Sequence, residues 1–215
     1  MIDYNRLIAS AAASALGPLG FVRKGRSRLW YADHAWWAGL VEFQPTAGGG
    51  GSYLNVGAKF LWGEPVWSFD YWTPPDIRKG GLTNFHTEPP ILAAERLSSA
   101  AADAARNLAL DLSGLARAAS HTARLAVRTN SERVRYHAAI LTGLAGQPDE
   151  AVQLLSAFGD DLENATGETW RANLQEDTAL LRGLETQQDI RTLVNDRIQR
   201  TRTQLRLNAR AAPLV

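Results

Sequence analysis

All but one of the tryptophans of this chain lie in about the first third of its sequence. Six of the seven lie between positions 30 and 72, among phenylalanine, tyrosine and valine residues that are separated by turn formers. Aromatic and β-branched residues favour strands, so this stretch predicts a β region. From Ile91 onward only Trp170 remains, and the strong helix formers dominate. This change in composition predicts an α+β protein, with an N-terminal helix and an antiparallel, aromatic-rich β-meander followed by an all-helical half.

Turn-forming segments divide the β region. Gly17-Pro18 ends the N-terminal helix, Asp33-His34 is expected to form a tight turn, and the glycines at 48–51 a flexible loop. We expect strands at 26–32, 36–45, 53–62 and 66–72. Because the connections are short, neighbouring strands should run antiparallel.

The second half carries the start and stop signals of helices. Asn130-Ser131 provides an N-cap and Pro148 a first-turn proline. Tyr136 to Ala151 resembles the turn of a tetratricopeptide-type hairpin, in a single copy, so we expect one packed helical pair rather than a solenoid. The sequence predicts domains at 1–90 and 91–215, and helices at 91–112, 113–128, 132–145, 148–158, 168–184 and 187–207.

Composition excludes several classes of protein. The formal net charge of the 215 residues is +1, so no overall field attracts nucleic acid or an anionic membrane. The absence of cysteine excludes disulfide scaffolds, thiolate metal sites and cysteine nucleophiles, and fits a reducing cytosol. No window approaches the ~18 to 20 apolar residues of a membrane span. We expect a cytoplasmic protein that does not insert into a membrane.

Cofactor and metal motifs are also missing. No two of the four histidines have metal-ligand spacing, and the glycine run lacks the lysine and the serine or threonine of a phosphate loop. Paired acids such as Asp149-Glu150 stand at helix starts, where the helix dipole accounts for them. We therefore predict no metal, no cofactor and no catalytic residue.

Alternation along the strands predicts two chemically different faces. In the 53–62 strand one set of side chains is wholly apolar and belongs against helices, whereas the other set is mixed. If the first strand keeps Leu29 and Tyr31 inward, charged, amide and aromatic side chains gather on the mixed face. The residues predicted to bind a partner there are Arg26, Arg28, Trp30, Trp36, Glu42, Gln44, Asn55 and Lys59.

Two basic stretches leave alternatives open. Arg23 to Arg28 holds four cations in six residues and could be a solvated strand entrance, meet an acidic protein, or bind phosphates beside the tryptophans. The near-zero net charge argues against nucleic acid. The arginines between 191 and 210 spread around a helix axis, which is typical of a solvated terminal helix.

The N-terminal third is similar to a known family. Residues 16–26, then Leu29-Trp30-Tyr31, residues 40–44 and residues 53–57 together resemble the bacterial domain of unknown function 4304 over about residues 3–75. The resemblance implies a helix with an aromatic-rich meander, and some members are considered immunity or interaction proteins near toxin loci. The glycine run after Gln44 departs from the family pattern.

The residues and the resemblance together favour one function. We expect a non-enzymatic bacterial interaction module that binds a protein, such as a toxin, through the mixed face. The alternative is an enzyme or small-ligand binder with a groove between sheet and helices, using Glu42, His34 or His86 as acid-base groups. The sequence leaves the oligomeric state open.

Overall fold

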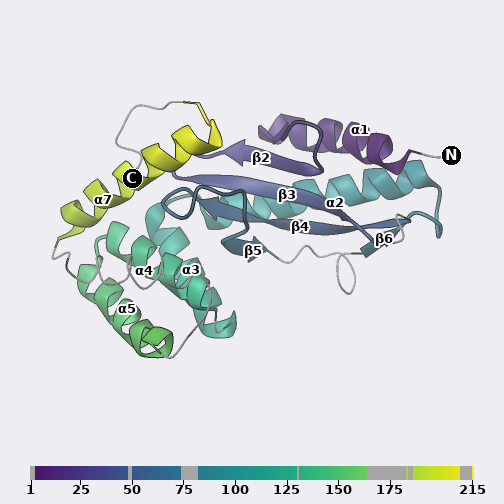
Figure 1. Ribbon diagram of the computed structural model, residues 1–215. Helices are drawn as coiled ribbons and strands as arrows, with labels where there is room; N and C mark the ends of the chain where they lie inside the picture. Colours follow the sequence, from purple (N-terminus) through teal and green to yellow (C-terminus); the bar gives the residue numbers. More distant parts are fainter. Residues whose placement is uncertain are drawn as a thin grey trace. The chain divides into compact units, whose positions relative to one another are not determined.

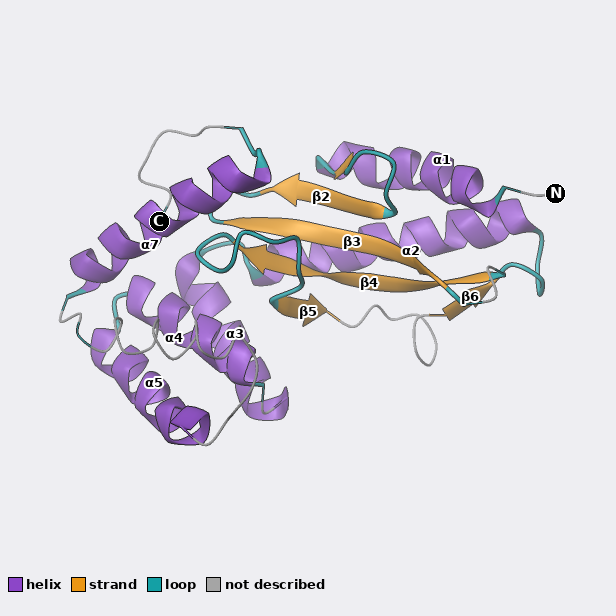
Figure 2. Ribbon diagram, in the orientation of Figure 1, coloured by secondary structure: helices purple, strands orange, loops and turns teal. Residues whose placement is uncertain are grey.

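The computed structural model describes residues 3–47, 50–73, 82–129, 131–163, 183, 186–208 and 215. The chain divides into two compact units, and each unit is discontinuous in sequence. The first contains Met1–Phe60 and Trp67–Leu110, and the second contains Leu61–Val66 and Asp111–Val215. The fold is α+β, as the composition predicts (Figures 1 and 2).

The first unit combines a six-stranded antiparallel sheet with two long helices. The Asp3 carboxylate caps the first helix by accepting from the Arg6 N–H at 3.1 Å, and Gly17-Pro18 ends it in a short 3-10 turn. The elements are α1 (Tyr4–Leu16), η1 (Gly17–Leu19), β1 (Val22–Arg23), β2 (Leu29–Asp33), β3 (Trp37–Pro45), β4 (Gly51–Phe60), β5 (Tyr71–Thr73), β6 (Leu82–Asn84) and α2 (Pro90–Asp111).

The sheet confirms the predicted meander and adds one strand to it. The strand order is β1-β2-β3-β4-β5, with β6 paired to the start of β4. The 26–32 strand was predicted too early, because residues 24–27 form a turn and Gly25 has a φ of +56°. The 66–72 strand shrinks to β5, and β6 lies in a stretch where the sequence analysis expects no strand.

Helices α1 and α2 cover one face of the sheet. Figure 1 shows α2 running behind β3 and β4. Every third or fourth residue of each helix is buried, including Ile8 and Ala12 of α1 and Leu97 and Leu108 of α2. The strand residues that face these helices include Trp37, Val41, Phe43, Leu54, Val56 and Phe60, all of which are buried. This apolar face is the core of the first unit.

The second unit is built around one helix. Its described helices are α3 (Leu115–Thr129), α4 (Glu132–Leu144), α5 (Pro148–Glu163) and α7 (Gln187–Leu205). Helix α4 packs against the other three, and all its residues from Tyr136 to Leu144 are buried. Gly143 makes close approach possible, because a Cβ there would lie 2.7 Å from the Ile190 Cδ1 of α7. Ser131 and Pro148 begin α4 and α5 as predicted.

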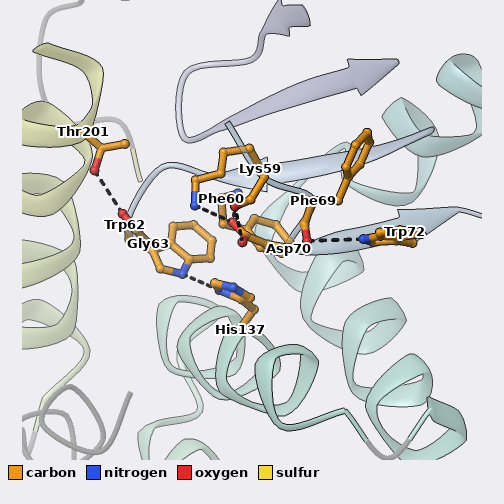
Figure 3. Close-up of polar contacts among 10 residues, drawn as sticks. Lys59, Phe60, Trp62, Gly63, Phe69, Asp70, Trp72, His137 and Thr201 are labelled. Atoms are coloured by element: carbon orange, nitrogen blue, oxygen red, sulfur yellow. Dashed lines mark hydrogen bonds and ion pairs between the residues drawn. The ribbon is translucent and has the colours of Figure 1, made fainter. Parts of the chain in front are cut away.

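A six-residue segment that follows β4 belongs to this second unit. The Trp62 indole N–H donates to the Nδ1 of buried His137 at 3.0 Å, and the Thr201 hydroxyl donates to the Gly63 carbonyl at 3.1 Å (Figure 3). The sequence places the division at residue 90, but the structure assigns α2 to the sheet and 61–66 to the helices. The helix predicted at 168–184 lies outside the described residues.

Candidate protein-binding face

The face of the sheet opposite α1 and α2 carries the mixed set of side chains. Strand register places its residues in rows across the sheet, because residues in register point to the same side. The rows are Gln44, Tyr53 and Leu82; then Leu29, Glu42 and Asn55; then Val22, Tyr31, Leu40, Gly57 and Trp72.

Three of the predicted residues form a polar cluster on this face. The Asn55 side-chain amide donates to Glu42 Oε2 at 3.1 Å and to Gln44 Oε1 at 3.0 Å. One amide group thereby holds a carboxylate and a second amide in fixed positions. The remaining lone pairs of Glu42 and Gln44 leave room for donors from a partner.

Large apolar side chains flank that cluster. Tyr53 is 39% exposed, Trp72 55% and Leu82 44%, and all three belong to the rows of the mixed face. The Trp72 indole donates to the Phe69 carbonyl at 3.3 Å, which orients its ring (Figure 3). We call these three residues together with Glu42, Gln44 and Asn55 the open face.

The chain itself covers the other part of the mixed face. The Trp67 ring lies over Tyr31, with centroids 4.6 Å apart, and Lys24 Nζ is 5.4 Å from the centroid of Trp67. Phe69 lies over Gly57, where an added Cβ would be 2.9 Å from the Phe69 ring. The segment after Val66 therefore reduces the surface that a partner could contact.

Lys59 is on the mixed face, as predicted, but it is 1% exposed. Its Nζ lies 2.8 Å from Asp70 Oδ2, and the same oxygen accepts from the Phe60 N–H at 3.0 Å (Figure 3). The ammonium group is therefore held inside the first unit by a carboxylate, and it stabilises the segment before β5. This burial corrects the expectation that Lys59 is available to a partner.

Trp30 and Arg28 are on the face opposite to the predicted one. Leu29 pairs with Glu42 and Tyr31 with Leu40, so Trp30 points toward the helices and is 6% exposed. The Arg28 guanidinium donates to the Phe43 carbonyl at 3.3 Å. Burial lowers the pKa of Arg28, and the nearby Arg23 lowers it further, whereas Asp3 acts against both.

Trp36 and Arg26 are also separated from the open face. Trp36 precedes β3 and is buried, and its ring is parallel to that of Phe60 with centroids 6.1 Å apart. Arg26 is exposed in the turn between β1 and β2. Arg23 holds that turn by donating to the Ser27 and Arg26 carbonyls at 2.6 and 3.0 Å. Two of the four cations, Arg23 and Arg28, thus donate to backbone carbonyls of the chain itself.

The three side chains that could act as acid-base groups in an enzyme, Glu42, His34 and His86, do not lie close together. His34 is in the β2–β3 turn and stacks on Trp37, with centroids 4.0 Å apart. His86 follows β6, at the opposite end of the sheet, roughly 30 Å away along a nine-residue strand. Glu42 is engaged with Asn55 between these ends. In the described part of the chain, no group of three or more histidines and acids could hold a metal ion.

Sequence reasoning missed Tyr53, Trp72 and Leu82 as open-face residues. Alternation already places Tyr53 in the mixed set, which is a usable signal. Trp72 and Leu82 join the face only through pairing of the short strands β5 and β6 with β4. Short irregular strands give no periodicity from which such a pairing could be derived.

Comparisons with protein-family models, with curated proteins and with solved structures find no match to this chain. The resemblance of the N-terminal third to domain of unknown function 4304 therefore stays a prediction. Among the described helices, none has both the length and the apolarity that crossing a membrane requires.

Proposed function

We propose that this chain is a non-enzymatic interaction module that binds a partner protein through the open face. The observation that carries the proposal is the exposure of Tyr53, Trp72 and Leu82 around the Glu42–Asn55–Gln44 cluster. Tryptophan and tyrosine bury a large area with few rotatable bonds, and they are enriched at the centres of protein interfaces. Fixed polar groups beside them supply orientation and specificity.

A finer proposal concerns the class of partner. The resemblance over residues 3–75 supports a toxin as the bound protein, and the absence of cysteine supports a bacterial cytosol as the site of action. A toxin gene beside the gene for this chain, and protection of cells from that toxin, would be the expected findings. If that toxin killed cells that produce this chain as efficiently as cells that lack it, the result would contradict this finer proposal.

The binding proposal is tested by affinity capture from the source cells. Tyr53→Ala combined with Trp72→Ala should lose the proteins that the unchanged chain retains, since truncating central aromatics typically weakens binding about 30-fold or more. Val127→Ala is the control, because it truncates an exposed apolar side chain on α3, outside the open face. Retention of the same proteins by the open-face variant would contradict the proposal.

A further inference from the structure

A groove of about 460 Å³ runs between α1 and α2. Both helices cover the sheet face opposite the open face, so the groove between them lies on the side of the first unit away from the open face. From α1 it is lined by Leu7 and by alanines and serines. From α2 it is lined by Ile91, Ala94, Glu95, Ser99, Ala102 and Arg106.

Five of the α2 residues that line this groove form a stripe, which Leu110 extends beyond the groove. Ile91, Glu95, Ser99, Ala102, Arg106 and Leu110 follow one another four, four, three, four and four positions apart. Such spacings keep residues on one side of a helix. The apolar ends of the stripe project into solvent, with Ile91 59% and Leu110 57% exposed.

The order of these spacings is the same in both directions. If a second α2 is laid antiparallel on the first, Ile91 faces Leu110, Glu95 faces Arg106 and Ser99 faces Ala102, each pair occurring twice. A two-fold interface requires this kind of self-complementarity, in which each residue meets a different residue of an identical surface. We propose that a second copy of this chain docks in the groove, with its α2 antiparallel to the first about an axis between Ala100 and Ala101.

Charge supports this register. Glu95 and Arg106 are exposed and opposite in sign, so the antiparallel arrangement creates two carboxylate–guanidinium pairs. Arg106 already contacts Asp103 of its own helix. A guanidinium has five N–H donors and can donate to a second carboxylate while it keeps its bond to the first. A parallel arrangement would instead bring like charges together.

Side-chain size supports close packing. Ser99 and Ala102 are at the centre of the stripe, and Ala11, Ser14 and Ala15 of α1 line the neighbouring wall. Small side chains let helix axes approach to about 8 to 10 Å. Each α2 would then occupy the groove of the other copy, which buries Ile91 and Leu110 at the two ends. An unrelated helix would need the same stripe in reverse, which the second copy has by symmetry.

Charge reversal tests the pairing. The unchanged chain should sediment as a dimer, and Glu95→Arg alone should raise the dissociation constant about tenfold or more, because each substituted arginine faces an arginine. The double variant Glu95→Arg and Arg106→Glu should restore the dimer. Arg117→Glu, on an exposed position of α3, is the control and should change nothing. A monomeric unchanged chain, or a double variant that stays monomeric, would overturn the proposal.

Cross-linking tests the orientation, and the chain has no cysteine of its own to interfere. In the proposed dimer Ser99 is about 5 Å along the axis from its counterpart, whereas Leu110 is about 28 Å from its own. A short bis-maleimide should therefore join two copies of Ser99→Cys and fail with Leu110→Cys. The reverse result would exclude the antiparallel register. Tyr53→Ala should leave cross-linking unchanged, so failure of the dimer and failure of the open-face proposal remain distinguishable.

Discussion

At the scale of single residues, Gly57 has the least room for a side chain among the described glycines. A Cβ at this position would lie 2.1 Å from the Tyr71 carbonyl oxygen and 2.9 Å from the Phe69 ring. Gly57→Ala should therefore displace β5 and lower the free energy of unfolding by about 1 to 3 kcal/mol in chemical denaturation. Gly114→Ala is the matched control, since nothing lies within 4 Å of its added Cβ. Equal stability of the two variants would show that β5 does not pack as described.

The buried Lys59–Asp70 pair gives a second prediction at this scale. Lys59→Met removes the ammonium group that faces the buried Asp70 carboxylate, which should cost about 3 to 5 kcal/mol of unfolding free energy. Combining it with Asp70→Asn removes the charge while an amide oxygen can still accept from the Phe60 N–H. The double variant should therefore be more stable than Lys59→Met alone. Additive losses in thermal or denaturant unfolding would refute this coupling.

Single residues also show where sequence reasoning fails. Leu29 and Tyr31 alternate with Trp30 and Ala32, so both faces of β2 are apolar and the pattern does not say which faces the helices. Only the pairing of Leu29 with Glu42 decides this. Similarly, the lysine at position 59 reads as a surface residue until its partner, Asp70, is brought to it by a loop. Local patterns do not encode such contacts.

At the scale of elements, prediction succeeds where the signals are local. Predicted helices at 91–112, 132–145 and 187–207 correspond to Pro90–Asp111, Glu132–Leu144 and Gln187–Leu205. A capping box explains the accuracy at α7: the Thr186 hydroxyl accepts from the Asp189 N–H at 3.1 Å, and the Asp189 carboxylate accepts from the Thr186 N–H at 3.3 Å. Strand ends at β2 and β5 are less accurate because tertiary pairing sets them.

The segment 61–66 gives a prediction at the scale of elements. Trp62→Phe removes the indole N–H that His137 accepts, so a buried ring nitrogen loses its donor. The variant should lose about 1 to 3 kcal/mol of unfolding free energy, with the loss seen by probes in α4. Trp72→Phe is the control, because its indole is largely exposed. Equal losses in the two variants would mean that the Trp62–His137 bond contributes nothing.

At the scale of the whole molecule, a cut at residue 90 should damage both units. Fragment 1–90 lacks α2, whose buried face completes the apolar core, and fragment 91–215 lacks the Trp62 and Gly63 contacts of α4 and α7. We expect lower unfolding midpoints and faster amide exchange in both fragments than in the whole chain. A first fragment extended to residue 110 should recover slow amide exchange. The amide exchange of the helical fragment 91–215 should stay fast, because that fragment still lacks Trp62 and Gly63. A fully protected 91–215 fragment would be inconsistent with the role given to 61–66.

The passage of the chain between its two units has a consequence for synthesis on the ribosome. The first unit can assemble once Leu110 has emerged, but the second needs Trp62 to meet a histidine 75 positions later in the chain. Since domains tend to fold in the order in which they are made, that indole is exposed in the nascent chain while the helices are still being translated. Slow translation beyond Leu110 would prolong this exposure, during which a chaperone could bind the segment.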